Sequence, residues 1–98
     1  MITRIWRGWA ATDRADEIAA DLREGVVARF AAARGNVSAQ VLLRPLAGGV
    51  ELLTISVWDS RDAVPVSVDE RHDLLVARQT IADCFEVVTA PAAVAHAA

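Results

Sequence analysis

The sequence lacks lysine and tyrosine and has a single cysteine, Cys84. Without lysine, the chain cannot form a Schiff base, and without tyrosine no phenol can donate a proton. One cysteine excludes an intrachain disulfide and favours a cytoplasmic protein. Even together with the two histidines, it does not supply the ligands of a structural zinc site. No segment approaches the ~20 apolar residues of a membrane span, and no signal peptide is expected.

Positive charge is also scarce. Lysine and arginine together number 10 against 13 acidic residues, which gives a formal net charge of −3. A nucleic-acid-binding protein needs a basic surface to neutralise phosphates, so this balance argues against that class.

Apolar residues are abundant, at 54% of 98 residues. This length allows one domain, and a domain of this size leaves a large part of its surface outside the core. An excess of apolar surface is usually covered by a partner. The composition therefore predicts a homodimer.

The first half of the chain predicts a strand, a helix and a hairpin. Residues 2–9 are rich in β-branched and aromatic residues, which is typical of a strand. A helix is expected over residues 13–34, capped by Thr12 or Asp13 and stopped at Gly35. Its apolar stripe recurs every four residues and comprises Ile18, Leu22, Val26 and Phe30.

Residues 37–44 and 51–58 alternate in polarity and predict two strands joined at Gly48-Gly49. Neither face of these strands is uniformly polar, so we expect helices on one face and a partner subunit on the other. Arg44 and Glu51 flank the turn and are placed to pair across the hairpin.

The second half predicts a short helical turn after Asp59-Ser60, a helix over residues 69–83 and a last strand over residues 84–89. The folded domain then spans residues 1–90, and residues 91–98 form an alanine-rich tail. The element order is β-α-β-β-α-β, which predicts an α+β, ferredoxin-like fold with a four-stranded antiparallel sheet.

The strand of residues 5–9, the long helix and residues 53–63 resemble the antibiotic biosynthesis monooxygenase family. The most telling part is a strand that ends in Trp58 and is followed by Ser60 and then by Ala63. The resemblance spans residues 1–89. It implies a dimeric α+β barrel in which two sheets pack face to face, with a pocket between the sheet and the helices of each subunit.

The resemblance implies oxidation of a small aromatic, quinol or polyketide-like substrate by molecular oxygen, with no cofactor. The alternative on the same dimeric fold is a non-catalytic protein that binds a small apolar or aromatic ligand or another protein. The haem-degrading branch of the family has an asparagine, a tryptophan and a histidine where this chain has Arg7, Ser67 and Ala77. Haem degradation is therefore not expected.

The candidate catalytic residues are Arg7, which would stabilise an anion, and His72, whose ordinary pKa suits a general base. Simpler roles for them are a salt bridge and an exposed helix face. Strand alternation places Arg4 and Arg7, and likewise Trp6 and Trp9, on opposite faces, and for Arg4 we favour a salt bridge. Cys84 is expected to be buried. The candidate pocket residues, for which core packing is the alternative, are Trp6, Trp9, Leu22, Phe30 and Trp58.

Overall fold

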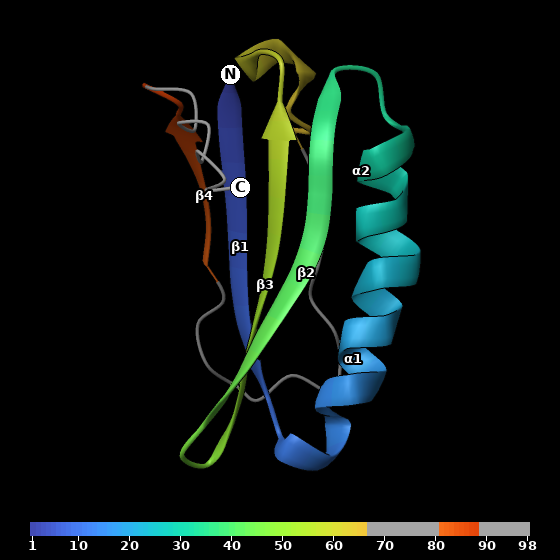
Figure 1. Ribbon diagram of the computed structural model, residues 1–98, viewed down its shortest axis with the longest axis vertical. Helices are drawn as coiled ribbons and strands as arrows, with labels where there is room; N and C mark the ends of the chain where they lie inside the picture. The colour runs from blue at the N-terminus through green and yellow to red at the C-terminus, as the bar shows by residue number, and fades with distance from the viewer. Residues whose placement is uncertain (67–80, 89–98) are drawn as a thin grey trace, which may run out of the picture.

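A single antiparallel sheet forms the centre of the protein (Figure 1). The structure is a computed structural model, and it describes residues 1–66 and 81–88. The spatial order of the strands is β2-β3-β1-β4, which is the order of a ferredoxin-like α+β fold and confirms the predicted class. The strands are β1 (Ile2–Ala10), β2 (Asn36–Leu46), β3 (Gly49–Trp58) and β4 (Ile81–Glu86).

One helical segment runs beside the sheet and packs against β2 and β3 (Figure 1). It comprises η1 (Thr12–Arg14), α1 (Ala15–Leu22), η2 (Arg23–Val27) and α2 (Ala28–Ala32). The predicted helix of residues 13–34 therefore exists but ends earlier, and its middle turn, η2, is π-helical. No helix within residues 1–66 and 81–88 has the length and apolar character needed to cross a membrane.

The predicted helix cap is wrong. Thr12 and Asp13 lie inside the first turn, and the residue before that turn, Ala11, makes no capping hydrogen bond with its side chain. The backbone satisfies this turn instead, because the N–H of Arg14 donates to the carbonyl of Ala11 at 3.0 Å. The helix ends at Ala32, before the predicted stop at Gly35, and its C-cap Ala33 is extended. Gly35 lies in the turn that leads into β2 and has a φ of 83°, a conformation that side chains rarely adopt.

Alternation along the central strands divides the sheet into a helix-facing side and an open side. Even-numbered residues of β1 and β3 pair across the two strands and lie beneath the helical segment. The buried residues form two clusters. One holds Trp6, Ala10, Ala15, Ile18, Leu22, Val50 and Leu52, and the other holds Val26, Phe30 and Trp58.

A β-bulge at the start of β2 changes the predicted alternation of that strand. Val37 lies between Asn36 and Ser38 in the bulge and is 52% exposed, so it does not join the core. The side-chain Nδ2 of Asn36 donates to the carbonyls of Ser38 and Val57 at 3.1 and 3.3 Å. The far end of β2 continues past Arg44 to Leu46, because an edge strand tolerates Pro45.

The predictions for the C-terminal part are partly wrong. Ile81–Asp83, expected at the end of a helix, belong to β4 and pair with β1. Cys84 is exposed rather than buried, because β4 is an edge strand and the described helical segment covers β2 and β3. The helical turn after Asp59-Ser60 is confirmed as η3 (Arg61–Ala63), without a side-chain cap. Residues 67–80, which hold most of the predicted helix of residues 69–83, and residues 89–98, which include the predicted tail, lie outside the described residues.

Gly8 makes room for the indole of Trp6 on the helix-facing side of β1. A Cβ atom at Gly8 would lie 2.5 Å from Cη2 and 2.8 Å from Cζ2 of that ring. By contrast, Gly25 in η2 has no atom within 4 Å of the place of its Cβ. The two glycines therefore differ in whether the fold needs them.

We expect Gly8→Ala to lower the free energy of unfolding by about 1–3 kcal/mol, because the Trp6 ring must shift within a packed core. Gly25→Ala is the matched control, and it should raise stability by up to ~1 kcal/mol through helix propensity. Urea unfolding followed by tryptophan fluorescence measures both. Equal effects of the two substitutions would contradict the role given to Gly8.

Candidate functional site

Four of the five predicted pocket residues lie on the helix-facing side of the sheet, and all four are buried. Trp6 and Leu22 belong to one core cluster, and Phe30 and Trp58 belong to the other. Each of these side chains is at most 4% exposed. The structure therefore brings them together in two pairs, and they pack against each other or against their neighbours.

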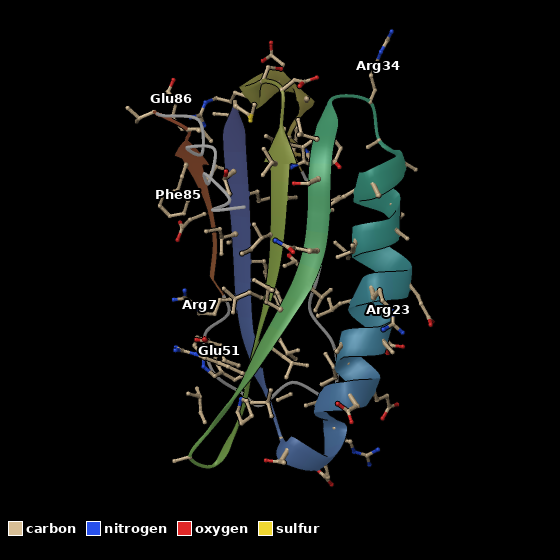
Figure 2. The ribbon with its side chains drawn as sticks, in the orientation of Figure 1. Arg7, Arg23, Arg34, Glu51, Phe85 and Glu86 are labelled. Atoms are coloured by element: carbon tan, nitrogen blue, oxygen red, sulfur yellow. The ribbon has the colours of Figure 1, made fainter. Side chains whose placement is uncertain are left out.

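Trp9 and Arg7 lie on the open side of the sheet. Trp6 and Arg4 lie on the helix-facing side, so each pair has the opposite orientations that strand alternation predicts. Figure 2 shows Arg7 beside Glu51, with their Nε and Oε2 atoms 3.5 Å apart. The predicted pair across the hairpin is confirmed, since Nε of Arg44 donates to Oε1 of Glu51 at 2.7 Å. Glu51 thus lies between two arginines, and its side chain is 8% exposed.

The open side has a hollow of about 350 Å³ around these charges. It is lined by Arg7, Leu42, Leu43, Arg44, Glu51 and Leu53. Because the Glu51 carboxylate already contacts both guanidinium groups, the arrangement explains how a charged group is accommodated on an otherwise apolar face.

His72 and His96 lie outside the described residues, so the proposed base has no described position. Within residues 1–66 and 81–88, no three His, Cys, Asp or Glu side chains are grouped so that they could hold a metal ion.

Arg4 is the charged residue that the structure places in the core. It lies on β1, a central strand, on the helix-facing side, and is 6% exposed. Arginine keeps its charge when buried, whereas most charged side chains are rarely buried to this extent. The sequence favoured a salt bridge for Arg4, which stays a prediction; the structure places the residue on a central strand rather than at an edge of the sheet.

Three contacts connect Arg4 to a small group of buried side chains. The Cζ atom of Arg4 lies 5.5 Å from the ring centroid of Phe30. The ring of Phe30 meets that of Trp58 edge to face, with centroids 5.3 Å apart and an interplanar angle of 77°. The indole Nε1 of Trp58 donates to Oγ of Ser56 at 2.9 Å. We call these four residues the Arg4 cluster.

Strand register explains why these residues meet. Arg4 pairs with Ser56 across β1 and β3, and on its other side it pairs with Cys84 of β4. Cross-strand partners share a face, so Ser56, Arg4 and Cys84 form a row on the helix-facing side. The row runs from the buried Ser56 to the exposed Cys84.

The Arg4 cluster combines a buried positive charge with two aromatic rings. A cation–π contact with an aromatic ring stabilises a desolvated guanidinium by ~2 kcal/mol. The charge of a buried guanidinium acts more strongly on a neighbouring group than it would in water. The sequence analysis did not choose Arg4 as a site residue. Its even number in β1 nevertheless places it on the same side of the strand as Trp6, which is the buried side.

Comparisons with known proteins give the fold. No protein-family model matches the sequence, and no curated protein matches it. A Bacillus cereus protein whose name proposes it as an antibiotic biosynthesis monooxygenase has a structure similar to this one, with a TM-score of 0.69 at 15% identity. That match covers 96% of this chain and 97% of the other. The chain has an antibiotic biosynthesis monooxygenase-like fold.

A second solved structure supports the same fold. The protein Rv0793 from Mycobacterium tuberculosis matches with a TM-score of 0.66 at 19% identity, over 93% of this chain and 98% of its own. The match of the monooxygenase-like fold over nearly the whole of both chains confirms the resemblance predicted from residues 1–89.

We expect Glu51→Gln to lower the free energy of unfolding by about 1–2 kcal/mol, because Arg44 loses a charge-assisted hydrogen bond to a buried carboxylate. Glu17→Gln is the matched control, since its pair with Arg14 is 53–55% exposed and should contribute little. Urea unfolding at two salt concentrations measures both. A loss at Glu17 as large as that at Glu51 would contradict the role of burial.

Proposed function

We propose that the protein is a cofactor-independent monooxygenase that oxidises a small aromatic, quinol or polyketide-like substrate with molecular oxygen. The observation that carries this proposal is the buried guanidinium of Arg4 in an aromatic environment on the helix-facing side. The monooxygenase-like fold supports the same reaction class.

The reaction needs a substrate whose C–H or O–H bond becomes acidic next to a positive charge. When the substrate loses that proton, Arg4 stabilises the resulting enolate or phenolate. The anion gives one electron to O₂, and the substrate radical and superoxide then combine into a peroxide anion, which takes the proton back from the protonated base to form a hydroperoxide. Loss of water converts a CH₂ group into a carbonyl, so one oxygen atom enters the product and the other leaves as water. His72 remains the predicted proton acceptor.

Arg4 replaces Arg7 as the preferred anion-holding residue. Arg7 lies on the open side and contacts Glu51, whereas Arg4 shares the helix-facing side with Trp6 and Phe30. A carboxylate beside Arg7 competes with an anionic substrate for that charge, which favours Arg4 for this role.

We further propose that two copies of the chain form a homodimer through their open sheet faces. Ile5, Leu53, Ile55 and Val57 lie on this face and are half-buried, and Phe85 is 53% exposed. The described helical segment covers the other face, and an apolar sheet face of this kind is usually covered by another layer. A second copy supplies that layer symmetrically, in keeping with the barrel expected from the sequence.

The monooxygenase proposal is tested with anthrone as the probe substrate, in an oxygen electrode. The wild-type protein should consume one O₂ per anthrone converted to anthraquinone, and Arg4→Gln should lower the rate at least ~100-fold. The exposed Arg34, labelled in Figure 2, provides the control Arg34→Gln, which should retain the rate. If Arg7→Gln removes activity and Arg4→Gln does not, the site lies on the open side.

The alternative function is non-catalytic binding of a small apolar or aromatic ligand. The buried polar residues described on the helix-facing side are Arg4, Thr54 and Ser56, and this lack of a general base among them favours the alternative. Saturable quenching of tryptophan fluorescence by anthraquinone, without oxygen consumption by anthrone or hydroquinone, would support this alternative and contradict the monooxygenase.

We expect Ile55→Asp to convert the dimer into a monomer, because it places a charge at the centre of the open face opposite Ile5. Ala31→Asp on the exposed side of α2 is the control and should leave the mass unchanged. Analytical ultracentrifugation at several concentrations measures both. A wild-type protein that is monomeric at all concentrations would contradict the homodimer.

A further inference from the structure

Ser56 has no direct part in the proposed reaction, yet it is fully buried at the centre of the Arg4 cluster. We propose that Ser56 is a positioning residue that fixes Trp58, through Trp58 the ring of Phe30, and through that ring the guanidinium of Arg4. The inference rests on the proposed function, because a fixed orientation of Arg4 matters for an anion that binds there.

The first step is the hydrogen bond from the indole. Trp58 and Ser56 are 0% and 1% exposed, so neither side chain has bulk water as an alternative partner. A buried indole N–H needs an acceptor, and Oγ of Ser56 provides it at 2.9 Å. This bond selects one orientation of the Trp58 ring plane within its apolar surroundings.

The second step is the ring contact. Phe30 and Trp58 meet at 77°, and this edge-to-face geometry depends on the relative tilt of the two rings. A rotation of Trp58 would therefore displace Phe30 or remove the favourable contact. Phe30 reaches this position from α2, so the contact also connects the helical segment to β3.

The third step is the contact with the guanidinium. Arg4 lies over the ring of Phe30, and the attraction between a cation and a ring is strongest over the ring face. Ser56 is also the cross-strand partner of Arg4. It therefore lies next to Trp58, where the series of contacts begins, and next to Arg4, where it ends. A guanidinium held in one plane favours planar anions that accept two hydrogen bonds, such as carboxylates, over neutral molecules of the same shape.

The direct test is NMR spectroscopy of the indole N–H of Trp58 and the Nε–H of Arg4, because neither signal requires turnover. Ser56→Ala removes the acceptor, and we expect hydrogen exchange at both groups to accelerate at least ~10-fold. Ser56→Thr keeps a hydroxyl and should restore protection at both. Ser60→Ala removes an exposed hydroxyl that makes no capping hydrogen bond, and it serves as the control that leaves both rates unchanged.

Ligand binding supplies a second measurement, with 1-naphthoate as the anionic probe and 1-naphthamide as its neutral analogue. Ser56→Ala should weaken naphthoate binding about tenfold and leave naphthamide binding within twofold. Equal weakening of both probes would overturn the proposal, because it would indicate a general loss of packing.

The two proposals fail in different ways. Unchanged exchange at Arg4 in Ser56→Ala overturns the positioning role, whether or not anthrone is oxidised. Absence of oxygen uptake by the wild type, together with faster exchange at Arg4 in Ser56→Ala, overturns the monooxygenase and supports the positioning role. Failure of Ser56→Thr to restore exchange protection in a folded protein also overturns the proposal.

Discussion

The pairing of β1 with β3 is the constraint on which the rest of the structure depends. Its register places even-numbered residues of both strands on one side, where the helical segment covers them. The same register places Arg4 opposite Ser56 and Trp9 opposite Glu51. A shift of one residue would bring Arg7 under the helix and move Arg4 to the open side. The register of β1 with β3 therefore determines the core, the open face and the position of the candidate site.

The two sides of the sheet accommodate charge by different means. On the open side, Glu51 lies between Arg7 and Arg44, and oppositely charged groups compensate each other. On the helix-facing side, Arg4 lies against the aromatic face of Phe30. The first arrangement sets a carboxylate between two guanidinium groups, whereas the second sets a guanidinium over an aromatic ring. This difference is why the proposed chemistry belongs to the helix-facing side.

Local patterns predicted most of the first 66 residues. Apolar repeats gave the helical segment, alternation gave the strands of the hairpin, and Gly35 and Gly48 marked turns that do have positive φ. Predictions based on side-chain patterns were wrong where a turn or a bulge of the backbone changed the local structure. The η1 turn took the place of a cap at Thr12 or Asp13, and the bulge left Val37 without a cross-strand partner and exposed. Ile81–Asp83 read as helix but pair with β1, since pairing with a distant strand outweighs local preference.

The sequence by itself determined the element order of the described part, the fold class, the opposite orientations of Trp6 and Trp9, and the chemistry that the missing lysine and tyrosine exclude. These properties follow from composition and from periodicity along the chain. Only the tertiary structure decided which side of β1 the helix covers, and hence that Arg4 rather than Arg7 is buried. Alternation separates two faces but does not say which one faces the core, because that depends on strand register and helix packing.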